Sequence, residues 1–208
     1  PELFVRHLDY LAANGFIVLP LATIVDSLRS GGRIPDRAVV FTFDDGYSSV
    51  YTAAFPLLRE RGWPFTVFVC PEAVDRRRGP VVTWDQLREM SAAGATVANH
   101  SNSHGHLQRR RSGESDAVWR ERVAAELVAA QSRIRQEIGE ARGLFAYPYG
   151  EYDPILQDLV RELGWAGFGQ HSGPASVGQD LTELPRFPMA GSFAALETFA
   201  VKVASLPL

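Results

Sequence analysis

The sequence predicts an α/β fold built on mostly parallel strands. Short β-rich segments alternate with helix-length amphipathic segments along all 208 residues. Several of the β-rich segments are continuous apolar runs, as expected for parallel strands that are covered on both faces. Glycines follow the helical segments where a left-handed residue would end each helix. Seven strands in a chain of this length fit either an open doubly wound sheet or a small barrel.

The predicted strands are short segments in which apolar and β-branched residues predominate. In chain order they are Phe16–Pro20, Ala38–Phe43, Phe65–Cys70, Ala95–Asn99, Leu144–Tyr147, Ala166–Gly169 and Leu184–Met189.

The predicted helices lie between these strands and have clear boundary signals. Thr83 with Gln86 matches a capping box, and Asp153 before Pro154 matches an N-cap followed by proline. The glycines that would end helices are Gly15, Gly31, Gly62, Gly94, Gly139 and Gly164. The helical ranges are Glu2–Ala13, Leu21–Arg29, Ser49–Arg61, Thr83–Ala93, Val118–Ile138, Pro154–Leu163 and Phe193–Ala204.

Composition favours one domain over residues 1–208 and excludes several classes of partner. The chain has 21 basic and 24 acidic residues, a net charge of −3, so it lacks the basic excess of a nucleic-acid or anionic-membrane binder. Its apolar runs are too short for a transmembrane segment. The single cysteine, Cys70, excludes an intramolecular disulfide and a cysteine-based zinc cluster. Because Pro1 opens directly onto an amphipathic helix, we expect an N-terminally truncated or processed chain.

Two adjacent carboxylates, Asp44 and Asp45, follow the second predicted strand. Ligands of α/β folds gather at the carboxyl ends of strands. A carboxylate pair leaving an apolar strand is costly to desolvate unless a cation or a proton-transfer role compensates it. Gly46 permits the tight turn that would free both side chains. The alternative is that the pair only caps the following helix.

Two histidines four residues apart, His100 and His104, follow the fourth predicted strand. If the segment turns or begins a helix, both rings face one way and can hold one divalent ion. Together with an aspartate they would form a set of two histidines and one carboxylate that leaves positions open for water and substrate. His106, on the same loop, is expected to take no part.

The segment Phe145–Gly150 (FAYPYG) is a rigid, aromatic strand end. It could form a groove wall and present a backbone N–H, although packed core aromatics would explain it equally well.

These three motifs, in this order, resemble the polysaccharide deacetylase (NodB-homology) family, also called carbohydrate esterase family four. The resemblance extends from about Phe4 to Met189. It implies a distorted (β/α)₇ barrel in which Asp44 is the general base. It further implies that the metal ligands are Asp45, His100 and His104, and that the backbone N–H of Tyr149 is the oxyanion donor.

The sequence departs from the family pattern in three places. Ala146 stands where the third motif carries an arginine, no fourth motif is recognisable near residues 167–173, and the fifth motif reads Leu184-Pro185-Arg186 without its histidine. In the similar short poly-N-acetylglucosamine deacetylases the acid histidine would precede Pro1. We therefore expect Arg186 to replace the missing arginine beside Asp44. Either His171 or Asp44 itself would supply the proton to the leaving amine.

The resemblance implies a metal-dependent amide hydrolase that removes N-acetyl groups from an acetylated glycan containing N-acetylglucosamine. Zn²⁺ is the expected ion, with Co²⁺, Ni²⁺ or Mn²⁺ as alternatives. A small-molecule deacetylase or deformylase, or a carbohydrate-binding protein that has lost turnover, remain alternative functions. Family members usually act outside the cytoplasm, and we expect the same here. No feature of the sequence indicates an oligomeric state.

Overall fold

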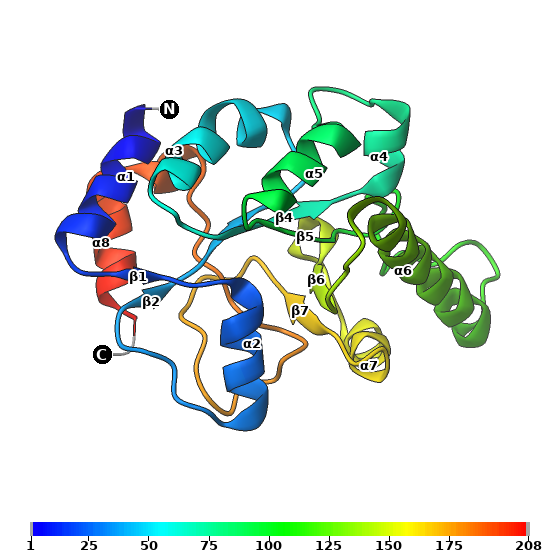
Figure 1. Ribbon diagram of the computed structural model, residues 1–208. Helices are drawn as coiled ribbons and strands as arrows, with labels where there is room; N and C mark the ends of the chain where they lie inside the picture. The colour runs from blue at the N-terminus through cyan, green and yellow to red at the C-terminus, as the bar shows by residue number, and fades with distance from the viewer. Residues whose placement is uncertain (1, 207–208) are drawn as a thin grey trace.

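A computed structural model describes residues 2–206 (Figure 1). Its main sheet has five parallel strands in the order β3-β4-β5-β6-β7, so each strand pairs with the next one along the chain. A separate parallel pair, β1 with β2, lies beside it. The strands are β1 Ile17–Val18, β2 Ala38–Val39, β3 Phe41–Phe43, β4 Phe65–Val69, β5 Thr96–Asn99, β6 Leu144–Ala146 and β7 Ala166–Phe168.

Helices cover the curved sheet, which forms a distorted barrel and confirms the predicted fold class (Figure 1). The capping box at Thr83 and the Asp153 N-cap are both present. The six glycines expected to end helices all have positive φ angles. The helices are α1 Glu2–Ala13, α2 Leu21–Ser30, α3 Phe55–Glu60, α4 Pro71–Arg76, α5 Trp84–Ala92, α6 Asp116–Ile138, α7 Pro154–Glu162 and α8 Leu196–Ala204.

The predicted strand Leu184–Met189 is wrong. Only Leu184 forms a β-bridge, to Phe168, and the chain beyond it is irregular. Pro185 and Pro188 explain the difference, because neither has a backbone N–H to donate to a neighbouring strand. The segment nevertheless stays beside β7, since the Leu184 N–H donates to Gly167 O (2.8 Å).

Three further elements differ from the predictions. The expected strand Ala38–Phe43 is divided at Val40, so that β2 pairs with β1 whereas β3 pairs with β4. The short helix α4 was not predicted at all. The expected helix Ser49–Arg61 begins with a π-helical turn over Val50–Ala54 before α3.

The core has a layer on each side of the sheet, and β4 shows why. All five β4 residues are buried, and alternate side chains point to opposite faces. Val67 and Val69 pack in one cluster with Leu58 of α3 and Leu87 of α5. Phe68 points into the barrel interior, where α2 closes the second cluster. This burial on both faces is what the continuous apolar run predicts.

The carboxyl ends of β3, β5 and β6 therefore meet at one edge of the sheet, because the strands are parallel. Within residues 2–206, no helix is both long and apolar enough to cross a lipid bilayer.

Candidate metal centre

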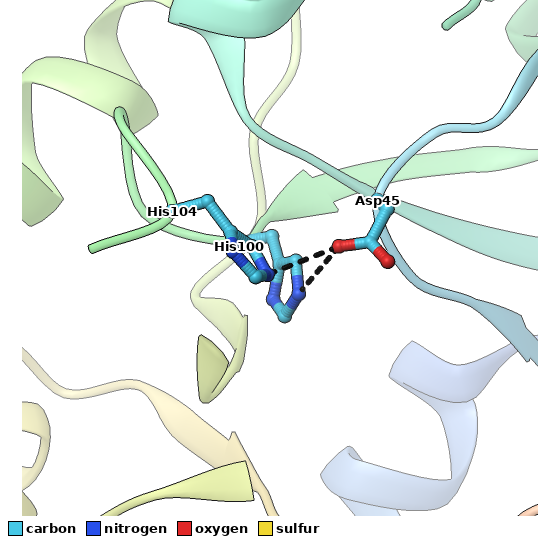
Figure 2. Close-up of side chains that lie close together, drawn as sticks. All are labelled: Asp45, His100 and His104. Carbon is cyan, nitrogen blue, oxygen red and sulfur yellow. Dashed lines mark ion pairs between the residues drawn. The ribbon is translucent and has the colours of Figure 1, made fainter. Parts of the chain in front are cut away.

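Asp45, His100 and His104 come together at this edge (Figure 2). Asp45 Oδ1 lies 3.3 Å from His100 Nε2 and 3.1 Å from His104 Nε2. One ligand atom from each residue lies within 4.8 Å of the other two. Two imidazole nitrogens and a carboxylate oxygen in this arrangement can surround one small cation.

A sharp turn after β3 separates the two aspartates. Asp45 and Gly46 both adopt left-handed conformations, with φ angles of 68° and 62°. A Cβ atom on Gly46 would lie 3.0 Å from Val69 Cγ1, so the chain needs glycine there for both space and conformation. The turn directs Asp45 towards the histidines and leaves Asp44 to contact Arg186.

The histidine loop, residues 100–104, is a compact turn rather than a helix. The side chain of Asn99 accepts from the Ser101 N–H (2.9 Å), and the Ser101 hydroxyl accepts from the His104 N–H (3.0 Å). Ser101 and His104 are both left-handed, with φ angles of 61° and 58°. Such strain in non-glycine residues persists only where the surroundings enforce it, and it gathers at functional sites.

The carbonyl of Ala146 fixes the orientation of the His100 ring. A carbonyl only accepts hydrogen bonds, so Nδ1 of the 1% exposed His100 side chain donates to Ala146 O (2.7 Å) and Nε2 faces Asp45. Hydrogen bonds with the two imidazoles hold the pKa of Asp45 well below its usual range, so its carboxylate is ionised. A neutral His100 that donates through Nδ1 leaves its Nε2 lone pair facing this carboxylate. Together with His104, these groups match the donor set that a divalent cation requires.

Arg186 holds both oxygens of Asp44. Its two terminal nitrogens donate to Oδ1 and Oδ2, each at 2.7 Å. The guanidinium is anchored by Gly169 O (2.9 Å) and the Thr42 hydroxyl (3.2 Å). The arginine therefore reaches Asp44 from the irregular segment beside β7, while Ala146 stays fully buried in the barrel interior.

Tyr149 lies beside the histidines in a strained turn. Its φ and ψ angles are 59° and 6°, and its side chain is half exposed. The ring packs edge-on against His104 with 4.6 Å between centroids, and the phenol donates to His104 O (3.3 Å). The backbone N–H expected to contact an oxyanion thus belongs to a turn that touches a candidate metal ligand.

His171 is exposed and lies outside the metal-ligand cluster. Among residues 2–206 its ring has one hydrogen-bond partner, the phenol of Tyr152, at 3.3 Å. Its carbonyl accepts from the Arg186 N–H (3.1 Å), so the residue borders the Arg186 segment.

Several residues that support the site were not predicted. Glu126 of α6 accepts from both the N–H and the hydroxyl of Ser103, at 2.6 and 2.7 Å. The Cys70 thiol donates to His100 O (3.0 Å), and burial raises its pKa, so it remains protonated. His106 lies outside the metal-ligand set, in agreement with the prediction, but it donates to Glu151 and stacks on Tyr149. No sequence signal marks Glu126, because it is one of many charged residues on a long helix.

Comparison with known proteins is consistent with this geometry. The family model described as polysaccharide deacetylase matches residues 31–168. The chain is 30% identical to the poly-β-1,6-N-acetyl-D-glucosamine N-deacetylase of Escherichia coli K12 over 230 aligned positions. The alignment covers 93% of this chain but only 34% of that enzyme, so the chain spans about a third of this relative's length.

Solved structures show the same architecture. IcaB from Ammonifex degensii matches with a TM-score of 0.81 and 26% identity over 97% of this chain and 88% of that one. The BpsB deacetylase domain from Bordetella bronchiseptica matches with a TM-score of 0.76 and 27% identity, over 86% of this chain and 81% of that one. With two thirds of its length matched by the family model and this architecture shared, the chain belongs to the polysaccharide deacetylase family.

Proposed function

We propose that this protein is a metal-dependent hydrolase that removes N-acetyl groups from a polysaccharide containing N-acetylglucosamine. The observation that carries the proposal is the convergence of Asp45, His100 and His104 beside an aspartate that Arg186 holds in place. Membership of a hydrolase family that acts on N-acetyl groups supports it. The β-1,6 linkage is supported by the name of the E. coli relative.

Asp45, His100 and His104 would hold the cation. Their two nitrogens and one oxygen suit Zn²⁺, with Co²⁺, Ni²⁺ and Mn²⁺ as alternatives. When bound, the ion would supply a Lewis acid for the amide carbonyl and for the attacking water.

Asp44 would act as the general base. It accepts a proton from the water as the water oxygen bonds to the acetyl carbon. Arg186 keeps both carboxylate oxygens in one orientation during this step. The backbone N–H of Tyr149 would donate to the carbonyl oxygen as negative charge develops there, and an analogous oxyanion contact in unrelated hydrolases is worth about 3 kcal/mol.

The leaving nitrogen needs a proton as the C–N bond breaks to give acetate and a free amine. Asp44 is supported as the donor because it has just received one and lies beside the ligand set. His171 is the alternative, and its ring contacts Tyr152 rather than Asp44. Replacing His171 with alanine separates the two, since a loss of about 100-fold in kcat, within the range of acid–base catalysis, would identify His171 as the acid.

Half exposure of Tyr149 at the edge of the site favours a polymer over a small molecule, because an extended chain needs an open surface. Acetate release tests the proposal. The protein is stripped of metal with a chelator and reloaded with each ion in turn. It is then given β-1,6- and β-1,4-linked N-acetylglucosamine oligomers. His104→Ala and Asp45→Asn serve as inactive controls. Binding of the oligomers without acetate release would instead identify a carbohydrate-binding protein, and cleavage of only small acetamides would identify a small-molecule deacetylase.

A further inference from the structure

A cluster of three side chains beside the metal ligands has no part in the mechanism above. His106 Nδ1 donates to Glu151 Oε2 at 2.8 Å. The His106 ring stacks face to face on Tyr149, with 4.1 Å between centroids and 13° between ring planes. His106 and Glu151 lie 45 positions apart in the chain, so this contact joins two separate loops.

Both loops carry residues on which the proposed reaction depends. His106 is two residues beyond the candidate ligand His104, and Glu151 is two residues beyond Tyr149. The phenol of Tyr149 also donates to His104 O at 3.3 Å, which makes a second connection between the same loops. Each ring of the His106–Tyr149 stack is therefore hydrogen-bonded to the opposite loop, and the two bonds hold the loops together.

The Tyr149 backbone needs such support. A φ angle near +60° is unfavourable for a non-glycine residue, and the conformation persists only when its surroundings enforce it. Behind the turn, Gly150 N–H donates to Tyr147 O (2.9 Å) and Glu151 N–H to Pro148 O (3.1 Å). On the other side of the turn, the Tyr149 side chain is half exposed and its ring stacks in parallel on the His106 ring.

We propose that His106 and Glu151 are positioning residues that lock the Tyr149 turn. Glu151 orients the His106 ring, and the ring holds the Tyr149 side chain and thereby its left-handed backbone. The Tyr149 N–H then stays at a fixed place relative to His104. The catalytic consequence rests on the proposed function, whereas the effect on backbone order does not.

Four substitutions separate stacking from hydrogen bonding. His106→Ala removes both, and Glu151→Ala frees the ring to rotate. His106→Phe keeps an aromatic face, and Glu151→Gln keeps an acceptor for the His106 N–H. Asp36→Ala is the control, because it removes an exposed ion pair with Arg33 at 3.8 Å on another part of the surface.

The first readout is amide hydrogen exchange over residues 147–152, measured on metal-free protein. Exchange should accelerate at least tenfold in His106→Ala and Glu151→Ala. It should change less than threefold in Glu151→Gln and the control, whereas His106→Phe, which keeps the ring face but loses the hydrogen bond to Glu151, should match Glu151→Ala. Wild-type exchange rates in His106→Ala would overturn the positioning role, and equal acceleration in Glu151→Gln and Glu151→Ala would overturn the role of the hydrogen bond.

The second readout is kinetic, on protein loaded with Zn²⁺ and given N-acetylglucosamine oligomers. A misplaced donor costs turnover rather than binding, so kcat should fall about 10- to 100-fold in the two alanine variants. KM and the Zn²⁺ content should stay within threefold of wild type. If KM instead rose about 10- to 100-fold while kcat stayed unchanged, the cluster would be a sugar-binding surface and the proposal would be overturned. If wild-type protein releases no acetate with any ion while exchange still accelerates in His106→Ala, the proposed function fails and the structural lock stands.

Discussion

Removing the Arg186 guanidinium should weaken both the fold and the reaction. Arg186 makes two charge-assisted hydrogen bonds to Asp44, each 2.7 Å long. The two side chains are only 15% and 20% exposed, so water replaces these bonds incompletely after truncation. A hydrogen bond to a charged group contributes about 1.5–3 kcal/mol. Water that enters the space left by the truncated side chain rehydrates Asp44 and offsets part of this loss. We expect Arg186→Ala to lower the free energy of unfolding by about 2–3 kcal/mol.

The effect on turnover follows from the loss of orientation. Without the bidentate contact the Asp44 carboxylate can rotate, and a displacement of about 1 Å at a reacting group costs about 100-fold in rate. Arg186→Ala should therefore lower kcat about 100-fold. Arg186→Lys, which offers a point charge in place of a planar fork, should give an intermediate loss.

Urea unfolding and acetate release measure the two effects separately. A double-mutant cycle with Asp44→Asn should give a coupling energy of about 2 kcal/mol, because each substitution removes the same contact. Arg142→Ala is the control: its side chain is 50% exposed, and it should change stability by less than about 0.5 kcal/mol. Wild-type kcat in Arg186→Ala would refute the assignment of Arg186 as the partner of the general base.

Three further perturbations have defined outcomes. Gly46→Ala forces a side chain into a left-handed position 3.0 Å from a β4 valine, so it should cost about 1–3 kcal/mol of unfolding free energy and reduce metal binding measured by calorimetry. Glu126→Ala frees the histidine loop and should weaken Zn²⁺ affinity about 10- to 100-fold in a chelator-competition assay with unchanged helicity by circular dichroism. Hydrogen bonds from Arg122 lower the pKa of Glu114 to about 2. Because this pKa is lowered, the pair stabilises the fold above pH 4.5 and the benefit disappears as the pH falls towards 2. Glu114→Gln should lower the Tm at pH 7 and have no effect near pH 2.

Much of the fold could be predicted because its signals are local. The apolar runs that became β4 and β5, the capping box at Thr83 and the helix-ending glycines each depend on a few neighbouring residues. The parallel arrangement places the residues after β3 and β5 at one edge, which is why the pair Asp44 and Asp45 could be singled out together with His100 and His104. The choice of Asp45 as the metal ligand came from the family resemblance. The strand expected at Leu184–Met189 failed because two prolines outweigh a weak apolar pattern.

The rest depends on contacts between distant segments. Arg186 was singled out from its motif position, but its anchoring by Gly169 and Thr42 depends on the barrel closing around it. Glu126 and Glu151 resemble ordinary surface carboxylates in the sequence. Only the packing of α6 against the histidine loop, and of two loops on Tyr149, gives them a structural role.

Anomalous diffraction from crystals grown with Zn²⁺, collected on both sides of the zinc edge, would locate the metal relative to Asp45, His100 and His104. We expect one strong peak per chain, at about 2.0–2.2 Å from Asp45 Oδ1 and from Nε2 of His100 and His104. The peak should disappear in His104→Ala. A wild-type crystal with no peak at these three atoms, or with the ion held by other side chains, would show that these residues do not form the metal site.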